Sequence, residues 1–211
     1  MITMADIQIL VREGEAEQLL DLIRQMLEAD HAAEEIINEG LLPAMVAVGE
    51  DFKDREIFIP EVMIAARAMN AGLVLLRPLI AGKSVNKGTV IIGTVKGDCH
   101  DIGKNIVKIM LEGKGLKVVD LGVDVAAEQY IKAAREYNAN IICCSALLTT
   151  TMGEMTRVVE QVKQEEMSCK VMIGGAVVSQ AYCDSIGADC YTEDASSAAD
   201  AAVVLCGAQA H

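Results

Sequence analysis

Residues 89–105 read TVIIGTVKGDCHDIGKN, a run that joins a strongly apolar segment to a polar, glycine-containing loop. Residues 89–95 are almost all β-branched or otherwise apolar, which is typical of a strand buried on both faces of a parallel sheet. The loop that follows carries Asp98, Asp101 and His100, which is one of only three histidines in the chain. Because ligands of α/β proteins bind where parallel strands end, we expect this loop to carry the chemistry of the protein.

The alternation of strands and helices continues from this loop to the C-terminus. We predict further strands near residues 117–121, 141–145, 170–174 and 189–192. Helices are predicted near residues 104–112, 126–137, 152–166, 180–186 and 196–205. Strict alternation of this kind specifies a parallel sheet that is covered by helices on both faces. We therefore expect residues 89–211 to form an α/β domain with a flavodoxin-like (Rossmann-like), doubly wound, five-stranded parallel sheet.

Residues 1–82 show the periodicity of helices instead. Apolar residues recur at steps of three and four, at Leu19, Leu20, Ile23 and Leu27 and again at Ile36, Ile37, Leu41, Met45 and Val48. Pro43 and Pro60 are each expected to lie in the first turn of a new helix. We predict a small antiparallel bundle of four or five helices, which a polar linker at residues 83–88 joins to the second domain.

The charge balance of the chain limits its partners. The 211 residues include 18 basic and 31 acidic side chains, a formal net charge of −13, whereas binding to nucleic acid requires a basic surface. The N-terminal sequence lacks the basic and apolar regions of a signal peptide, and no apolar stretch approaches the roughly 20 residues that span a bilayer. We therefore expect a cytoplasmic protein that binds neither nucleic acid nor membrane.

The seven cysteines include no C-x-x-C pair, and Cys143 and Cys144 are adjacent within an apolar run. Cysteines of this kind act as small apolar core residues in a reducing compartment. We expect most of them to be reduced and buried, in place of disulfides or a metal site.

The spacing of Asp98 and His100 indicates a supported metal ligand. Because they are two residues apart on an irregular loop, the carboxylate can accept one ring N–H of His100, which fixes the tautomer and leaves the other nitrogen as an electron donor. Gly97 and Gly103 allow a bulky group to approach the backbone closely. One histidine cannot form a zinc or iron site alone, so the other ligands would belong to a cofactor. The alternative is a loop histidine that is hydrogen-bonded only to a neighbour.

Three motifs that each follow a predicted strand resemble the signature of cobalamin-binding proteins. They are D-x-H-x-x-G at Asp98, His100 and Gly103, S-x-L at Ser145 and Leu147, and G-G at Gly174 and Gly175. Residues 54–72, DREIFIPEVMIAARAMNAG, are similar to the helical cap of cobalamin-dependent methionine synthase and of the small methyltransferase corrinoid proteins. The resemblance covers nearly the whole chain, and on this basis the protein is identified as a member of that group.

The resemblance implies a mode of cofactor binding. In this family the benzimidazole of the cofactor leaves the cobalt, and His100 would replace it as the lower axial metal ligand. The loop residues implied to contact the cofactor are Gly97, Asp98, Cys99, His100, Asp101, Ile102 and Gly103. The slot for the nucleotide tail is implied at Ser145, Leu147, Thr149, Gly174, Gly175 and Ala195. Asp98 and the hydroxyl of Thr151 would support His100, although serine is the familiar residue at the position of Thr151.

The resemblance also implies that cap residues cover the upper, methyl-bearing face of the corrin. The matching residues are Phe58, Ile59, Val62 and Met63. Phe58 is the preferred candidate, since it is one of only two phenylalanines and directly precedes a predicted helix. The alternative for these residues is the core of the bundle, and the alternative for the paired glycines is an ordinary turn between strand and helix.

The implied function is that of a methyl carrier in one-carbon metabolism. Cobalt(I) would accept a methyl group and methyl-cobalt(III), as methylcobalamin, would pass it on, with the protein as a non-catalytic corrinoid component. The implied partners are a substrate-specific methyltransferase, an acceptor methyltransferase of the tetrahydrofolate or thiol type, and a reductive activator. The implied methyl donors are methylamines, quaternary amines, methanol and methoxylated aromatics.

Three other functions share part of these features. A subunit of an adenosylcobalamin-dependent mutase has D-x-H-x-x-G but not this helical cap. A cobalamin-sensing regulator has cap and sheet but normally adds a DNA-binding domain. A flavodoxin-like signalling domain would bind no cobalamin.

Overall fold

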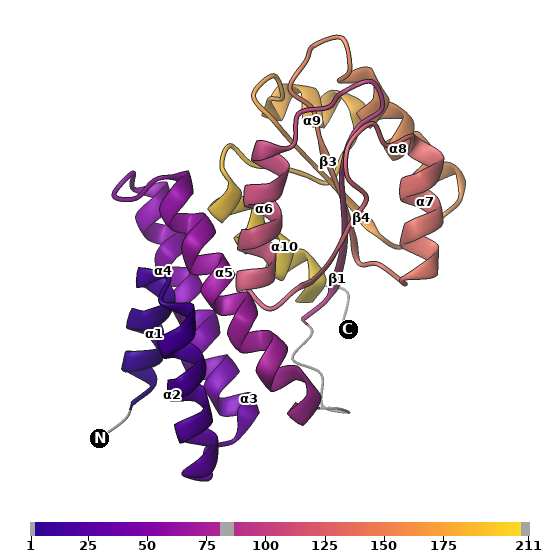
Figure 1. Cartoon of the computed structure of the whole chain (residues 1–211). Helices are drawn as coiled ribbons and strands as arrows, with labels where there is room; N and C mark the ends of the chain where they lie inside the picture. Colours follow the sequence, from indigo (N-terminus) through magenta and orange to yellow (C-terminus); the bar gives the residue numbers. More distant parts are fainter. Residues whose placement is uncertain (1–2, 81–86, 208–211) are drawn as a thin grey trace. The chain divides into compact units, whose positions relative to one another are not determined.

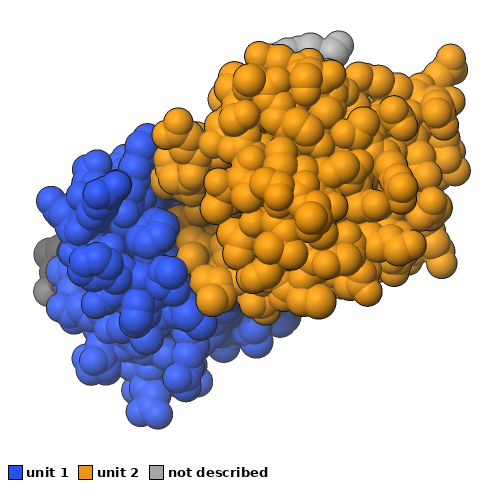
Figure 2. All heavy atoms as spheres, turned by 90° about the horizontal axis from the view of Figure 1, so that it is seen from above, with its two compact units in different colours: residues 1–85, 113–115 blue, residues 86–112, 116–211 orange. Residues whose placement is uncertain are grey.

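The computed structural model describes residues 3–80 and 87–207, which form two compact units (Figure 2). One unit comprises residues 1–85 and 113–115, and the other comprises residues 86–112 and 116–211. Residues 83–86 of the predicted linker lie outside the described residues.

The described elements of the first unit are all helices. Its elements are α1 (Met4–Glu13), α2 (Ala16–Glu28), α3 (Ala33–Glu35), the π-helix η1 (Ile36–Leu41), α4 (Leu42–Lys53), α5 (Ile59–Leu76) and the 3₁₀-helix η2 (Arg77–Ile80). Helix α1 begins at a capping box between Thr3 and Asp6 and ends at Gly14, which adopts the left-handed conformation with φ +76°. Most of the periodic apolar residues are buried and form the core of the bundle, whereas Leu20 and Leu27 are only partly buried.

The prediction that Pro43 lies in the first turn of a helix is confirmed, although this helix follows the preceding helical segment without a break. The chain remains helical from Ala33 to Lys53, and Pro43 lies in the first turn of α4 directly after η1. The N–H of Leu42 donates to the carbonyl of Ile37, five residues earlier. A proline in a regular α-helix clashes with the carbonyl four residues before it, and the wider π-turn lets the helix continue.

In the described part of the chain, one helix, α5, is long and apolar enough by length and composition to cross a membrane. It has 18 residues and a mean hydropathy of 1.5, so the expectation that no stretch approaches this length is wrong for α5. One face of α5 packs against α1, α2 and α4, and Ala65, Ala68 and Met69 on that face are fully buried. A core helix of a bundle is apolar for this reason.

The second unit is a five-stranded parallel sheet between two layers of helices (Figure 1). The strands are β1 (Thr89–Thr94), β2 (Lys117–Asp120), β3 (Ile141–Ser145), β4 (Lys170–Gly174) and β5 (Cys190–Tyr191). The helices are α6 (Ile102–Gly113), α7 (Ala127–Glu136), α8 (Gly153–Gln164), α9 (Gln180–Ile186) and α10 (Ala195–Gly207). The strand order β2-β1-β3-β4-β5 confirms the predicted flavodoxin-like fold.

Both faces of the sheet are buried, as the continuous apolar strands predict. Helices α6 and α10 cover one face, and α7 and α8 cover the other (Figure 1). Ile91 and Ile142 pack with Tyr130 of α7 and Val158 of α8 in one core cluster.

The seven cysteines are all free, and five of them are buried. Burial raises the pKa of the Cys143 thiol to about 12, so this thiol stays neutral and unreactive. Cys99 is exposed.

The order of the strands reverses between β1 and β3. Val90 to Thr94 pair in register with Ile141 to Ser145, so both strands end at the same level. The loop after β1 and the loop after β3 therefore lie side by side at the carboxyl edge of the sheet, where ligands of this fold bind.

Candidate functional site

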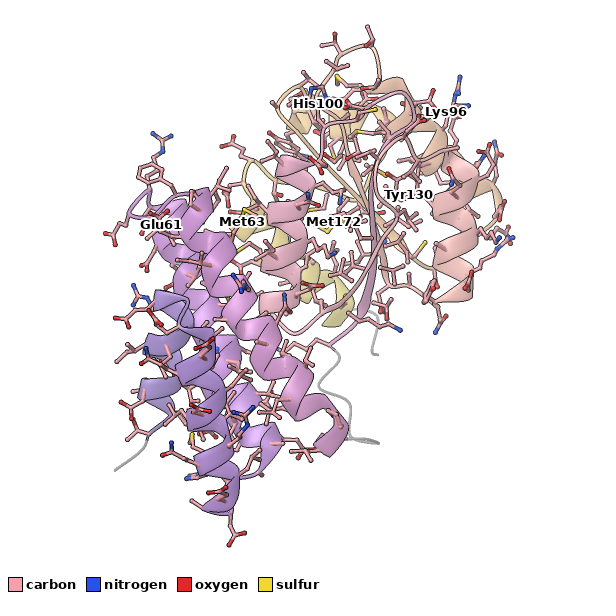
Figure 3. All side chains as sticks on the ribbon, viewed as in Figure 1. Glu61, Met63, Lys96, His100, Tyr130 and Met172 are labelled. Atoms are coloured by element: carbon pink, nitrogen blue, oxygen red, sulfur yellow. The ribbon has the colours of Figure 1, made fainter. Side chains whose placement is uncertain are left out.

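His100 lies on the loop beyond the carboxyl end of β1 (Figure 3). Its Nδ1 is 2.7 Å from Oδ1 of Asp98, and its backbone N–H donates to the same oxygen at 3.1 Å. The imidazole is 51% exposed, whereas the Asp98 side chain is fully buried. A carboxylate can only accept, so Nδ1 carries a proton, and in the neutral imidazole the lone pair is on Nε2. This arrangement is that of a metal-ligating histidine whose tautomer and orientation are fixed.

The second oxygen of Asp98 is held by the loop that follows β3. Oδ2 accepts from the backbone N–H of Leu147 at 2.8 Å, from that of Leu148 at 3.3 Å and from the hydroxyl of Thr151 at 2.9 Å. Burial raises the pKa of Asp98, but the hydrogen bonds from Leu147, His100 and Thr151 outweigh it, and the net pKa lies well below its ordinary value. Asp98 is therefore a carboxylate at neutral pH, and Thr151 is in place to support it.

Other contacts fix the backbone of the loop that carries His100, and the sequence did not reveal them. The hydroxyl of Thr94, which is fully buried, donates to the carbonyl of His100 at 2.8 Å. The N–H of Gly97 donates to Oδ1 of Asp124 at 2.7 Å, and the N–H of Asp124 donates to the carbonyl of Asp98 at 3.0 Å. Asp124 lies in the segment VDLGVDV, where an aspartate after a glycine turn was the one available signal.

The glycines of the predicted site differ in what surrounds them. A Cβ on Gly175, whose φ is +130°, would lie 1.9 Å from the carbonyl oxygen of Ala146, so only glycine fits there. A Cβ on Gly174 would meet one atom, the carbonyl oxygen of Thr192, at 4.0 Å. A Cβ on Gly103 would meet nothing within 4 Å. The backbone is open at Gly103 and Gly174, which suits the close approach of a large flat group.

The remaining residues predicted to contact the cofactor include exposed, partly buried and buried side chains. Exposed residues around His100 are Gly97, Cys99, Asp101, Ile102, Leu147 and Thr149. Ser145 pairs with Gly174 across β3 and β4, and both are partly buried. Ala195, the first residue of α10, is buried. The rim of the His100 site is apolar at Ile102 and Leu147, which are 65% and 40% exposed.

Two of the predicted cap residues, Phe58 and Val62, differ in exposure. Phe58 is 66% exposed, whereas Val62 is fully buried. Val62 therefore has no exposed side-chain surface, as expected for the alternative position in the bundle core. Val62 shares the buried face of α5 with Ala65 and Met69, whereas Phe58 precedes the helix.

The protein alone does not offer a complete metal site at His100. No group of three or more His, Cys, Asp or Glu side chains that could hold a metal lies within residues 3–80 and 87–207. One imidazole with a free Nε2, an apolar rim and open glycine backbone fits a metal that brings its other ligands in a macrocycle. The residues present thus fit a corrinoid.

Comparison with known proteins identifies the family. Residues 88–203 match the family model of the B12 binding domain, and residues 4–77 match a second model with the same description. A corrinoid protein of Desulfitobacterium hafniense is 39% identical over 201 residues, which cover 92% of this chain and 93% of that protein. Dimethylamine corrinoid protein 1 of Methanosarcina mazei is 48% identical over 168 residues, 78% of each chain. This chain belongs to the corrinoid proteins.

A solved structure supports the same conclusion. The crystal structure of a methanol:cobalamin methyltransferase complex from Methanosarcina barkeri contains a chain that this corrinoid protein resembles with a TM-score of 0.89 and 30% identity. The match covers 95% of this chain and 78% of that chain. The cofactor of this corrinoid protein is cobalamin, in agreement with the chemistry of the His100 site.

Proposed function

We propose that this corrinoid protein is the methyl carrier of a methyltransferase system and that His100 Nε2 is the lower axial ligand of its cobalt. The observation that carries the proposal is the 2.7 Å hydrogen bond from His100 Nδ1 to a buried carboxylate, which leaves Nε2 to donate its electron pair to a metal. When bound, the cofactor supplies a cobalt that accepts a methyl group as cobalt(I) and releases it from methyl-cobalt(III).

The chain's own residues hold and orient the cofactor. Asp98 fixes the ring of His100, and Thr151 fixes Asp98. Ser145, Gly174 and the start of α10 at Ala195 are proposed to bind the nucleotide tail. Phe58, which is exposed, is the proposed cap residue toward the methyl-bearing face.

A methylated amine is the proposed source of the methyl group, because a relative that is 48% identical is named a dimethylamine corrinoid protein. Methanol is the second candidate, since the solved complex is a methanol:cobalamin methyltransferase. The proposed partners are a substrate methyltransferase, an acceptor methyltransferase of the tetrahydrofolate or thiol type and a reductive activator, in the cytoplasm. The net charge of −13 supports protein partners with basic docking faces and not nucleic acid.

Electron paramagnetic resonance of the protein with cobalt(II) cobalamin tests the axial ligand. In protein labelled with ¹⁵N-histidine and given unlabelled cofactor, each cobalt line should split into a doublet, whereas unlabelled protein should give triplets. His100→Ala should remove the doublet. Triplets in the labelled protein would mean that benzimidazole remains on the cobalt, and this would refute the proposal.

A second experiment, with methylcobalamin as the cofactor, distinguishes the methyl carrier from a mutase subunit. A methyl carrier loaded with methylcobalamin should transfer the methyl group when mixed with an acceptor methyltransferase and its thiol or folate. A clear preference for adenosylcobalamin, with no methyl transfer, would favour the mutase.

A further inference from the structure

A buried ion pair lies beside the His100 site but makes no contact with His100 itself. It joins Lys104, in the first turn of α6, to Asp120, the last residue of β2. The Lys104 side chain is 2% exposed, and its Nζ lies 2.7 and 2.8 Å from the two oxygens of Asp120 and 2.7 Å from Oδ1 of Asn105. A lysine buried to this degree is rare unless its charge is paired.

Asp120 also shapes the chain that follows it, residues 121–125. Its Oδ1 accepts the N–H of Gly122 at 2.9 Å, and Gly122 turns the chain with φ +82°. Burial raises the pKa of Asp120, but Lys104, the Gly122 N–H and Lys108 outweigh it, so the carboxylate stays ionised. The ion pair thus fixes the first turn of the 121–125 segment.

The 121–125 segment continues the pairing with β1 beyond the end of β2. Gly122 accepts from Thr94 N–H at 3.0 Å, and Val125 N–H donates to the carbonyl of Thr94 at 3.0 Å. Asp124 of this segment accepts the N–H of Gly97 and donates its own N–H to the carbonyl of Asp98, and both residues lie in the loop of His100. The His100 loop is therefore connected to Asp120 in two ways. At one end, the loop leads into α6, whose Lys104 binds Asp120. At the other end, Asp120 fixes the 121–125 segment, whose Asp124 binds the loop.

We propose that Lys104 and Asp120 are positioning residues for His100, which hold the 121–125 segment so that Asp124 keeps the His100 loop in the geometry for axial ligation. This inference rests on the proposed function, because it assigns the pair to the same histidine. Lys104 is connected to the His100 loop both directly, since α6 begins directly after the loop, and through Asp120 and the 121–125 segment. Removing the ammonium would leave Asp120 with Lys108 at 3.4 Å, a partly exposed and weaker partner.

The test compares two ion pairs of the same unit. Lys104→Met breaks the pair beside the site. Lys170→Met is the control for losing a lysine–aspartate pair elsewhere in the unit, because Lys170 binds Asp189 at 2.9 Å, and Asp189 also accepts a backbone N–H, that of Val171, at 2.8 Å. Lys170 is 43% exposed, so this control matches the contacts of the pair but not its burial. Lys170 is the first residue of β4, so its pair lies at the amino edge of the sheet, away from His100.

Two readouts are measured on the full chain. Without cofactor, amide exchange of Gly97 and Asp124 should become at least about tenfold faster in Lys104→Met and remain near the wild-type rate in Lys170→Met. With cobinamide, which lacks the benzimidazole, the affinity of Lys104→Met should fall about tenfold, the lower end of what losing a ligand's support costs. His100→Ala gives the baseline for binding without axial ligation.

Each outcome decides between the alternatives. If both readouts in Lys104→Met match those of Lys170→Met, the pair is merely structural and the inference is wrong. If Lys104→Met does not fold, Asp120→Asn, which keeps an oxygen acceptor, gives the same comparison. If amide exchange is faster in Lys104→Met but the wild-type protein shows no ¹⁵N-histidine splitting, the proposed function fails while the pair still positions the loop.

Discussion

A methyl group on the Cα of Gly175 would lie 1.9 Å from the carbonyl oxygen of Ala146. The two residues come from the ends of β4 and β3, so the G-G motif is also a packing contact between neighbouring strands. Gly175→Ala must push the β3 loop, which holds Asp98, or distort its own backbone at φ +130°. We expect the free energy of unfolding to fall by at least about 2 kcal/mol, measured by urea titration without cofactor.

Gly174→Ala is the control for this change. Its Cβ would meet one atom at 4.0 Å, so stability should stay within about 0.5 kcal/mol of the wild type. If Gly174 lies against the nucleotide tail, its variant should bind cobalamin more weakly but cobinamide unchanged. Equal losses of stability in both variants would show that the close contact at Gly175 does not matter.

Asp98→Asn should destabilise the protein even without cofactor. Asp98 accepts on both oxygens, and the amide of asparagine places an NH₂ group against donors on one side whichever way it turns. We expect a loss of about 2–3 kcal/mol in the free energy of unfolding, because a buried N–H then lacks an acceptor. Asp101→Asn, an exposed neighbour that accepts from Asn105 at 3.2 Å, should change stability little.

The hydroxyl of Thr151 can be separated from its methyl group. Thr151→Val keeps the shape but removes the hydroxyl, which lies 2.9 Å from both the Asp98 carboxylate and the carbonyl of Leu148. We expect about 1.5–3 kcal/mol lower stability, the range for a hydrogen bond to a charged group, and almost none of this loss in Thr151→Ser. If Val and Ser behave alike in chemical denaturation, the hydroxyl does not support Asp98.

The low pKa of Asp98 predicts how stability depends on pH. Its folded pKa lies below the ordinary value of 3.8, so the folded state favours the carboxylate. That stabilisation is fully present above the unfolded pKa and is lost as pH falls toward the folded pKa. The stability difference between wild type and Asp98→Asn should therefore be constant from about pH 5 to 7 and shrink below about pH 4. A difference that grows on acidification would contradict the assignment.

Phe58 and Val62 should respond oppositely to truncation. Val62→Ala removes two methyl groups from a fully buried site and should cost about 2 kcal/mol. Phe58→Ala, at a residue that is 66% exposed, should leave thermal unfolding nearly unchanged. Any effect of Phe58→Ala on methyl transfer would then arise from a surface contact and not from instability.

Much of the fold follows from local patterns. The apolar run at residues 89–95 and the regular alternation after it predict β1 and the parallel sheet, and the period of α2 predicts its buried face. The first-turn position of Pro43 was predicted correctly, but the π-helix that joins its helix to the preceding turn was not, because no sequence period reveals a π-turn. The burial of Val62 could not be predicted, because similarity to a cap segment does not say which side of α5 faces the bundle core.

The sequence by itself determined which groups can react: an imidazole and a carboxylate two residues apart on a loop, where reach alone brings them together. Only the tertiary structure decided that this carboxylate is buried, ionised and oriented toward His100. The groups that donate to its second oxygen come from residues 49 to 53 positions away. The same holds for Lys104 and Asp120, which are 16 positions apart and pair because α6 packs back on β2. Spacing along the chain fixes local contacts, whereas the ionisation of a buried group depends on partners that only packing brings close.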